Sequence, residues 1–294
     1  MTTTLAPPPS HQPPPPALSP GGRTTIRVLL ILAAGALIVA VVAASVTAAW
    51  GVSSFRVVKD STTLPSTLTS VVIDTGSVPV AVRITTDRQS REPRVDMRMI
   101  NSVRAGADPL AVNADGTTAQ VTINAEPSEF LQWGRAGEIT LVLPPEVARR
   151  LSVTTQQQTG VVFAQADLDE LNARTVDGAV VLSGSARRVQ IINQHGDVTT
   201  REPIAVSQDF RATTDTGDIS VGFAEVPPIV EAETQDGDVV ISLPPPGPYF
   251  VDATTGVEHA TTVVRVPQTR DRDSAAAVIT ARATTGDVVV VDER

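Results

Sequence analysis

The segments Thr213–Val221 (Thr-Thr-Asp-Thr-Gly-Asp-Ile-Ser-Val) and Glu233–Ile241 (Glu-Thr-Gln-Asp-Gly-Asp-Val-Val-Ile) decide the fold of this chain, because they are two copies of one pattern. Each places a Gly-Asp turn between two short runs of alternating apolar residues. Further turns recur with spacings of 18, 18, 21, 20 and 19 residues along Gly160, Gly178, Gly196, Gly217, Gly237 and Gly256. Such a period predicts one supersecondary unit that is copied and stacked.

The residues around each turn alternate between apolar and polar. Before Gly217 the apolar positions are Phe210 and Ala212, and after it they are Ile219 and Val221, with mostly polar residues between. This period of two predicts two short strands per repeat, each with one buried face. The β-branched residues that fill these positions suit the pleated surface of a strand.

Two arrangements of the turn satisfy this pattern. In one, the turn is a two-residue hairpin and the strands form an antiparallel sheet. In the other, the glycine is a corner and each repeat is a rung stacked on the next. The constant phase of the turns and the slim buried residues favour stacking over a sandwich or meander. We therefore predict an all-β fold, a β-solenoid (parallel β-helix-like) of 18–21-residue repeats that follows one transmembrane helix and a disordered Pro-rich N-terminal tail.

The N-terminal region divides by composition. Residues 1–27 form a Pro-rich segment, predicted to be disordered because it has little apolar surface to bury. Residues 28–50 are predicted to be a transmembrane helix, since the 22 residues Val28–Ala49 carry no charge and would span about 33 Å as a helix. A cleaved signal peptide is the alternative, but its apolar region would be shorter. Residues 51–65 are predicted to be a juxtamembrane stalk, and residues 66–294 an extracytoplasmic β-strand-repeat domain.

The expected partner of Val28–Ala49 is therefore the lipid bilayer, and the expected localisation is the cell membrane, single-pass, with the N-terminus cytoplasmic. Residues 85–140 are less regular than the repeats, and we interpret them as an insertion or as longer strands that cover the first rungs. The final strand at Val288–Val291 is expected at or near a sheet edge, with the charged C-terminal residues blunting it.

Charge and cysteine content narrow the function. All 32 acidic residues follow Trp50, with 21 of the 23 basic ones, so that this part has a formal charge of −11. A basic face for nucleic acid is therefore not expected. The chain has no cysteine, which excludes disulfides and thiol catalysis.

The repeated aspartates next to the glycines are the only repeated chemistry in the chain. Aligned carboxylates on stacked rungs would lie about 4.8 Å apart and could share Ca²⁺. Asp beside Gly is also ordinary turn chemistry, and we favour that interpretation. The aspartates in question are Asp197, Asp218, Asp238 and Asp287.

Two histidines and two arginines invite a catalytic interpretation. His195 occupies an ordinary turn position, and His259 has no acid or nucleophile placed with it by the sequence. Arg187 and Arg188 are the weak candidates for a polysaccharide lyase, which needs basic residues near its acidic substrate. No hydrolase, zinc-protease or phosphate-loop motif is present. We predict no catalytic, cofactor-binding or metal-binding residues and no cofactor.

The motif Thr-x-x-Gly-Asp-[Val/Ile] resembles the bacterial putative-adhesin family of β-strand-repeat proteins, which is common in actinobacteria. The resemblance spans residues 66–294 and rests on Thr213–Val221, Thr234–Ile241, Ala283–Val290 and Leu141–Pro144. It implies a β-repeat architecture and transfers no functional residue. Gly178-Ala179 and Gly256-Val257 depart from the Gly-Asp pattern.

These observations predict a membrane-anchored extracytoplasmic module with an adhesin-like binding role or a structural role, and no enzymatic activity. An envelope sensor that signals through the N-terminal tail is the alternative. A carbohydrate-active β-helix enzyme is the least favoured.

Overall fold

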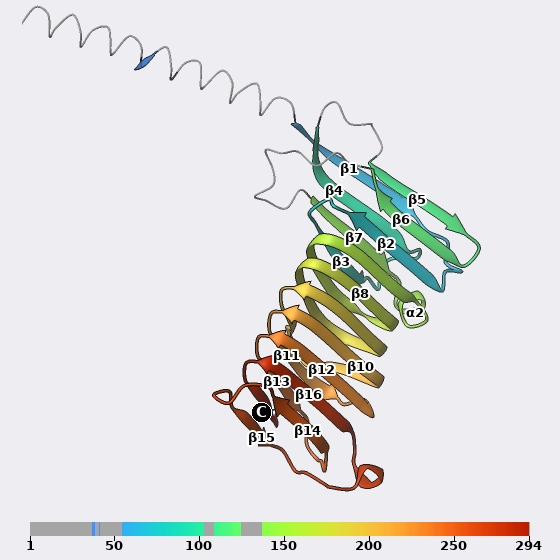
Figure 1. Ribbon diagram of the computed structural model, residues 1–294. Helices are drawn as coiled ribbons and strands as arrows, with labels where there is room; N and C mark the ends of the chain where they lie inside the picture. The colour runs from blue at the N-terminus through green and yellow to red at the C-terminus, as the bar shows by residue number, and fades with distance from the viewer. Residues whose placement is uncertain (1–36, 39–40, 42–54, 103–108, 125–136, 294) are drawn as a thin grey trace, which may run out of the picture. The chain divides into compact units, whose positions relative to one another are not determined.

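A computed structural model describes residues 37–38, 41, 55–102, 109–124 and 137–293, and its β unit begins at Phe55 (Figure 1). The described helical elements of this unit are a one-turn helix α2 (Pro145–Ala148) and a 3₁₀ turn η2 (Arg272–Ser274). The strands are β1 (Phe55–Thr63), β2 (Ser70–Gly76), β3 (Val80–Thr86), β4 (Arg94–Ser102), β5 (Leu110–Asp115), β6 (Thr118–Ile123), β7 (Gly137–Leu143), β8 (Ser152–His195), β9 (Val198–Thr200), β10 (Ile204–Thr216), β11 (Ile219–Glu225), β12 (Ile229–Asp236), β13 (Val239–Leu243), β14 (Phe250–Thr255), β15 (Thr262–Arg265), β16 (Val278–Thr285) and β17 (Val288–Asp292).

The strands on either side of each corner glycine form a rung, and successive rungs pair in parallel. Phe210 of β10 pairs with Val230 of β12 ahead of the corner, and Ile219 of β11 pairs with Val239 of β13 beyond it. The turn is therefore a corner and not a hairpin, and like residues lie above like residues. β8 supplies more than one rung by itself, since it runs for 44 residues through its own corners (Figure 1).

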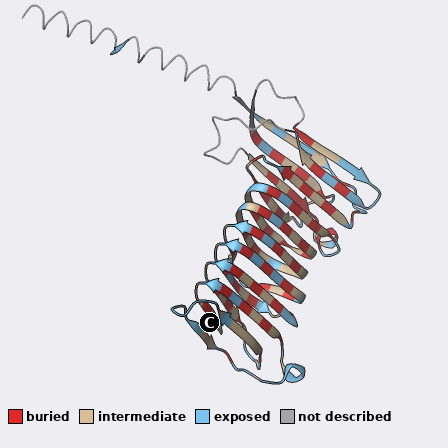
Figure 2. Ribbon diagram, in the orientation of Figure 1, coloured by how far each residue is buried: buried red, intermediate tan, exposed pale blue. Residues whose placement is uncertain are grey.

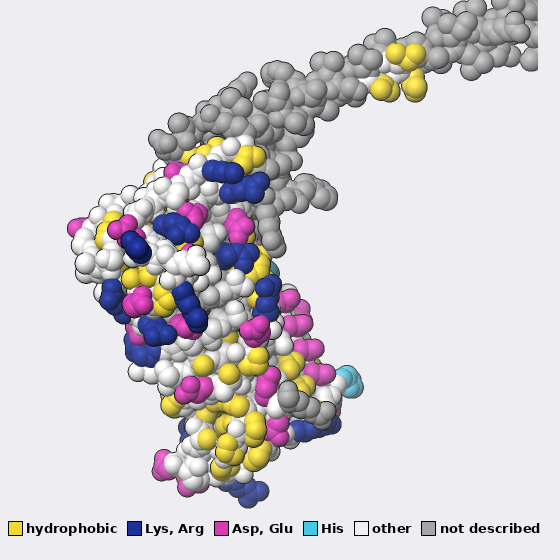
Figure 3. All heavy atoms as spheres, turned by 180° about the vertical axis from the view of Figure 1, so that it is seen from behind, with side chains coloured by type: hydrophobic (Ala, Val, Ile, Leu, Met, Phe, Trp, Pro, Cys, Tyr) yellow, Lys and Arg dark blue, Asp and Glu magenta, His cyan; other side chains and the backbone are white. Residues whose placement is uncertain are grey.

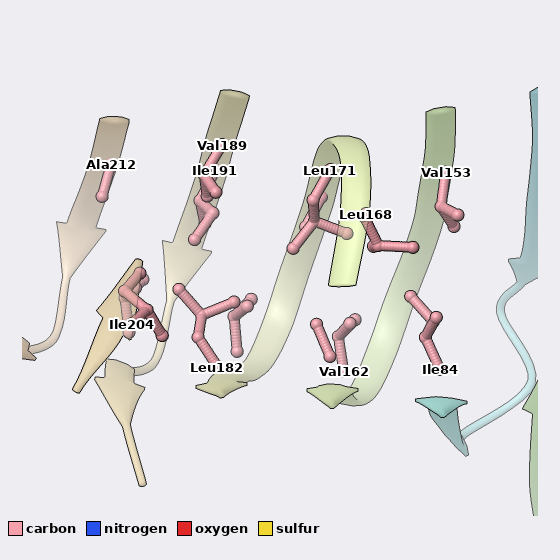
Figure 4. Packing of buried hydrophobic residues seen from close by; sticks show 14 of the residues in the cluster. Ile84, Val153, Val162, Leu168, Leu171, Leu182, Val189, Ile191, Ile204 and Ala212 are labelled. Carbon is pink, nitrogen blue, oxygen red and sulfur yellow. The ribbon is translucent and has the colours of Figure 1, made fainter. Parts of the chain in front are cut away.

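The alternation that defines the strands in sequence also defines the core. Buried residues recur at every second position along the strands (Figure 2). Figure 4 shows Leu171, Leu182 and Val189 directed into the space enclosed by neighbouring rungs. Two larger side chains, Phe210 and Phe223, fill the interior and meet edge to face with ring centroids 5.3 Å apart. Such a pair adds about 0.5–1.5 kcal/mol to the burial of its area.

Glycine is required at the corners because the corners stack on one another. A Cβ built on Gly217 would collide with the carbonyl oxygen of Gly196, and one on Gly237 with that of Gly217. Both residues also have positive φ, at 137° and 148°. The column of glycines therefore serves two purposes: it permits the backbone turn and lets the rungs approach to hydrogen-bonding distance.

The N-terminal part of the unit adds antiparallel strands to the stack. β2 and β3 form a rung against β8, as the weak copy of the pattern at Gly76 predicts. β1 pairs antiparallel with β4, β4 with β7, and β5 with β6. The irregular region thus supplies strands beside the first rungs. β1 is also a correction, because it occupies most of the predicted stalk, residues 51–65, where period-two alternation is weak.

The last rungs are stacked out of sequence order. β16 lies between β12 and β14, and β17 lies between β13 and β15. Val288–Val291 thus lies next to the end of the stack, as expected of a strand at or near an edge, and β14 and β15 take the end position. Asp287, next to Gly286, continues the column of aspartates: its N–H donates to the Oδ1 of Asp238, and its own Oδ1 accepts from the N–H of Thr261, an acceptor that Val257 lacks.

The predicted fold class needs correction as a whole, although its all-β content is confirmed. The strands of the described residues form a single 17-stranded sheet that mixes parallel and antiparallel pairs. Strands β8, β9, β11 and β10 pair in a closed circuit of four. A β-solenoid of uniform consecutive repeats is therefore wrong for this chain, because the spacing of the turns reported local stacking and carried no information on the added strands or on rung order.

The predicted transmembrane helix is not found among the described residues. None of the helices there has the length and apolar character needed to cross a bilayer. Apart from Leu37, Ile38 and Val41, the segment Val28–Ala49 lies outside the described residues, as does the Pro-rich segment 1–27.

Candidate functional site

The aspartates that follow the corner glycines bond to the next rung. The Oδ1 of Asp197 accepts from the backbone N–H of Asp218 at 3.0 Å, and the Oδ1 of Asp218 accepts from that of Asp238 at 2.8 Å. In the same way, the Oδ1 of Asp238 accepts from the backbone N–H of Asp287 at 2.8 Å, and the Oδ1 of Asp287 accepts from that of Thr261 at 2.7 Å. The four carboxylates are thus brought into a column, as predicted. Each holds the backbone of a neighbouring rung, so these bonds differ from the local turn chemistry that the sequence led us to favour.

A second polar column lies inside the corners. The Nδ2 of Asn193 donates to the carbonyl oxygens of Gly178 at 2.9 Å and Gly196 at 2.8 Å. Two rungs further on, the hydroxyl of Thr234 donates to the carbonyl oxygen of Gly217 at 2.9 Å. These buried side chains satisfy corner carbonyls that the parallel ladders leave free, so their role is to close the turns.

The two histidines do not form a catalytic constellation in the described residues. His195 Nδ1 lies 3.1 Å from Asp177 Oδ1, and both side chains are more than half exposed, at 59% and 60%. His259 is exposed in the turn after β14. Within the part of the chain that the structure describes, no three His, Cys, Asp or Glu side chains are placed to hold a metal ion.

Arg187 and Arg188 are engaged by carboxylates and so are not free to meet an acidic substrate. The Nε and Nη2 of Arg187 donate to the two carboxylate oxygens of Asp169, at 2.6 and 2.8 Å. Arg188 Nε bonds Asp209 at 2.8 Å. The bond that Arg187 donates lowers the pKa of Asp169 below its ordinary value, although burial opposes the shift. The bond that Arg188 donates to Asp209 raises the pKa of Arg188.

The same pairing continues along the outward face of the strands that precede the corners. Arg211 lies 3.1 Å from Glu231, and Arg282 lies 3.2 Å from Glu233. These ion pairs link neighbouring rungs. On an exposed face each ion pair contributes little to the stability of the protein, but together the pairs cancel most of the charge of this face.

Arg174 differs from these paired arginines. Its side chain is exposed on the same outward face, and it has no ion pair or hydrogen bond within the described residues. It lies in a groove of about 450 Å³ over the first rungs. The groove is lined by Asp74, Gly76, Gln156, Gln157, Gln158, Arg174, Thr175, Val176, Ile192 and Gln194.

The chemistry of this surface, called here the Arg174 groove, is that of a polar binding site. Gln156, Gln158 and Gln194 are exposed and offer both amide donors and acceptors. Ile192 is 42% exposed and adds an apolar contact. Asp74 already accepts from the backbone N–H of Gly76 at 2.9 Å. A guanidinium among amides can hold a carboxylate or another planar anion through two parallel bonds.

The fold and these surfaces define a β-repeat protein whose outward faces are polar and mostly charge-compensated. Residues 152–291 match the model of the family described as Toastrack DUF4097. The match covers β8 to β17, slightly less than half of the 294 residues. It supports the predicted resemblance to a β-strand-repeat family of unassigned function, and it does not show an actinobacterial origin.

Solved structures show similar but distant folds. A putative adhesin from Parabacteroides merdae has a TM-score of 0.46 at 10% identity, with 81% of this chain and 97% of that chain covered. A putative adhesin from Bacteroides fragilis has a TM-score of 0.42 at 11% identity, with the same coverage. A putative cell adhesion protein from Clostridium sporogenes has a TM-score of 0.39 at 12% identity, covering 81% and 100%. At these scores the likeness carries no argument about function. The comparison with curated proteins finds no match.

Sequence reasoning did not find the Arg174 groove. Arg174 sits at an outward position of the repeat like Arg282, so that nothing in the pattern separates the two. The difference is in the neighbouring rungs: Arg282 meets Glu233 and Asp252, whereas Arg174 meets no carboxylate of the described chain within 4.0 Å. A comparison of residues at the same repeat position in adjacent rungs, 18 residues apart, would have given the signal: Gln156 and Ile192 flank Arg174.

Proposed function

We propose that this chain is an adhesin-like extracytoplasmic binding module, anchored in the membrane by Val28–Ala49, that takes a polar ligand with an anionic group in the Arg174 groove. The observation that carries the proposal is that Arg174 has no ion-pair partner among the described residues, on a face where Arg188, Arg211 and Arg282 all have carboxylates. An exposed cation without a partner is free to give its full charge to a ligand.

The stacked rungs support a binding role over a purely structural one. Their strands hold outward side chains at fixed spacing, so that glutamines of adjacent rungs act together on an extended ligand. Side chains on rigid strands lose less freedom on binding than those on loops. The ligand class that fits is an acidic polysaccharide, whose hydroxyls match the amides and whose carboxylates match the guanidinium.

The membrane anchor and the outward orientation rest on the sequence alone. They are supported by the uncharged run Val28–Ala49 and by the absence of acidic residues before it. The proposal assigns no catalysis to the chain.

The direct test is binding of the full chain, in detergent or nanodiscs, to polygalacturonate as an acidic polymer and dextran as a neutral one. Arg174→Gln should weaken polygalacturonate binding by about 10-fold or more, since a charge-assisted bidentate contact contributes roughly 1.5–3 kcal/mol. Arg201→Gln is the matched control, because Arg201 is exposed, makes no ion pair in the described chain and lies outside the groove. Equal affinity of Arg174→Gln and the parent protein would reject the groove as the ligand site.

A further inference from the structure

Two cations face each other on the antiparallel part of the sheet. Lys59 of β1 and Arg98 of β4 are directly opposite in the register, and both are exposed. Directly opposite residues of an antiparallel pair have Cβ atoms about 4.5–5.5 Å apart, and like charges at that distance destabilise the pair. Neither side chain makes an ion pair or hydrogen bond within the part of the chain that the structure describes.

The nearest carboxylates are held by other arginines. Glu138 of β7 is opposite Arg98 in the register, but its Oε1 accepts from Arg83 Nε at 2.7 Å. Asp96 is two residues from Arg98 on β4, and its oxygens are bonded by Arg94 at 3.0 Å and Ser61 at 2.6 Å. The outward side of these strands thus carries four basic side chains and two carboxylates, and the unpaired charges are those of Lys59 and Arg98.

The unpaired cations line a groove of about 450 Å³, together with Ser61, Met97, Thr140 and the acidic residues Asp60, Asp96 and Glu138. Beside them on β1 lies Val57, an outward apolar side chain that is 56% exposed. A large exposed apolar residue next to basic residues is the composition of surfaces that sit at the boundary between lipid headgroups and water. We call Val57, Lys59 and Arg98 the β1–β4 face.

The β1–β4 face is unusual in a unit that is acidic as a whole. Figure 3 shows Lys and Arg side chains gathered toward the upper half of the unit in that view, with hydrophobic side chains more prominent in the lower half. The aspartates of the corner column belong to later rungs. An anionic surface would therefore attract the N-terminal strands of the unit and repel its acidic corner edge. The two effects together would orient the unit with its N-terminal strands toward that surface.

We propose that the β1–β4 face docks on an anionic lipid bilayer, with the headgroup phosphates between Lys59 and Arg98 and Val57 at the acyl boundary. The argument for lipid over another polyanion is chain length. Only residues 50–54 separate the proposed span Val28–Ala49 from β1, which is about 21 Å of extended chain from Ala49 to Phe55. This inference rests on the proposed anchor but not on the Arg174 groove.

The test uses the full chain in vesicles of phosphatidylcholine alone or mixed with phosphatidylglycerol. Because the chain has no cysteine, Thr63→Cys on the outward side of β1 can carry a single fluorophore, and Thr254→Cys on β14 serves as the distant control. Nitroxide-labelled lipid should quench the label at position 63 in vesicles with phosphatidylglycerol and not the label at position 254. High salt should remove the quenching.

Lys59→Gln combined with Arg98→Gln should lower the ratio of docked to undocked protein by roughly 30-fold, because the double variant loses the attraction of two basic residues to the headgroup surface. Arg201→Gln with Arg265→Gln removes the same charge from other exposed positions and should leave the ratio unchanged. Equal quenching at position 63 in the two lipid mixtures, or an equal loss in both double variants, would overturn the proposal.

Two further outcomes separate this inference from the proposed function. If the chain is not retained by neutral vesicles, the anchor is wrong, and sedimentation with phosphatidylglycerol vesicles then tests the face by the same pair of double variants. If polygalacturonate protects position 63 in neutral vesicles and lipid never quenches it, the face binds a polysaccharide and the lipid proposal is wrong.

Discussion

The backbone N–H of Asp238 donates to the Oδ1 of Asp218, one rung away, at 2.8 Å. The bond repeats between Asp197 and Asp218 and between Asp238 and Asp287. The carboxylate therefore acts as an acceptor for the next rung, and a neutral side chain with the same acceptor should replace it. The first two predictions follow from this relationship.

Asp218→Asn should be nearly neutral, because its amide oxygen can still accept from the Asp238 N–H. Asp218→Ala removes the acceptor and should lower the free energy of unfolding by about 1 kcal/mol, the usual contribution of one hydrogen bond. Thermal or urea unfolding of the two variants measures the difference. If Asp218→Asn is as destabilised as Asp218→Ala, the charge and not the acceptor is what matters.

Calcium should have little effect on the melting temperature, because the Oδ1 atoms of the column are already occupied by backbone donors. A specific ion at 100 times its Kd would stabilise the protein by about 2.7 kcal/mol. Melting curves in chelator and in excess Ca²⁺ provide the measurement. A shift of that size that disappears in Asp218→Asn with Asp238→Asn would show that the column is a cation site.

Substitution of the corner glycines should separate backbone strain from steric collision. Gly76 has φ of 54° and no atom within 4 Å of a built Cβ, whereas Gly237 has φ of 148° and its Cβ would meet the carbonyl oxygen of Gly217. Gly76→Ala should cost about 1 kcal/mol from strain alone, and Gly237→Ala several times that from strain and overpacking together. Gly222→Ala is the control, since its Cβ would meet only the flexible end of Glu293 at 3.0 Å. Similar stabilities of the Gly237 and Gly222 variants would contradict the stacked corners.

Gln157 should be replaceable by leucine with a gain in stability. It is 6% exposed, and neither polar atom of its side chain has a partner in the described residues. Burying an unsatisfied polar group costs about 1–3 kcal/mol, and Gln157→Leu removes that cost. Chemical denaturation measures the change. A loss of stability would show instead that the amide holds an ordered water together with the buried Thr155 and Thr175.

The Arg187–Asp169 pair should contribute to stability in a pH-dependent way. Its hydrogen bond lowers the pKa of Asp169, so the unfolded state binds the proton at higher pH than the folded state does. The contribution is therefore complete above the ordinary pKa of 3.8 and is lost as the pH falls through the lowered value. Arg187→Gln should melt slightly below the parent at neutral pH, and the two curves should converge in strong acid. If the melting temperatures of the two proteins differ by the same amount at all pH values, the Arg187–Asp169 pair is not the source of that difference.

The sequence predicts the alternation of the strands and the position of the corners well, because both depend on local chemistry: a buried face of period two and a glycine that must turn. It predicts rung order poorly. Gly256 follows Gly237 by 19 residues and looks like the next corner, yet Gly286 stacks there. The Arg174 groove and the β1–β4 face were missed, because an unpaired charge is defined by neighbours in other rungs, which the pattern within one repeat does not show.

The most direct test of the central claim is ligand protection at matched positions of two rungs. Gln194 and Gln235 both lie two residues before a corner glycine, but Gln194 lines the Arg174 groove and Gln235 bonds Asp215 at 3.1 Å. In the cysteine-free chain, Gln194→Cys and Gln235→Cys can be alkylated with and without polygalacturonate. We predict that the polymer slows alkylation at position 194 and leaves position 235 unchanged. Equal protection at both positions, or none at 194, would contradict a ligand site at Arg174.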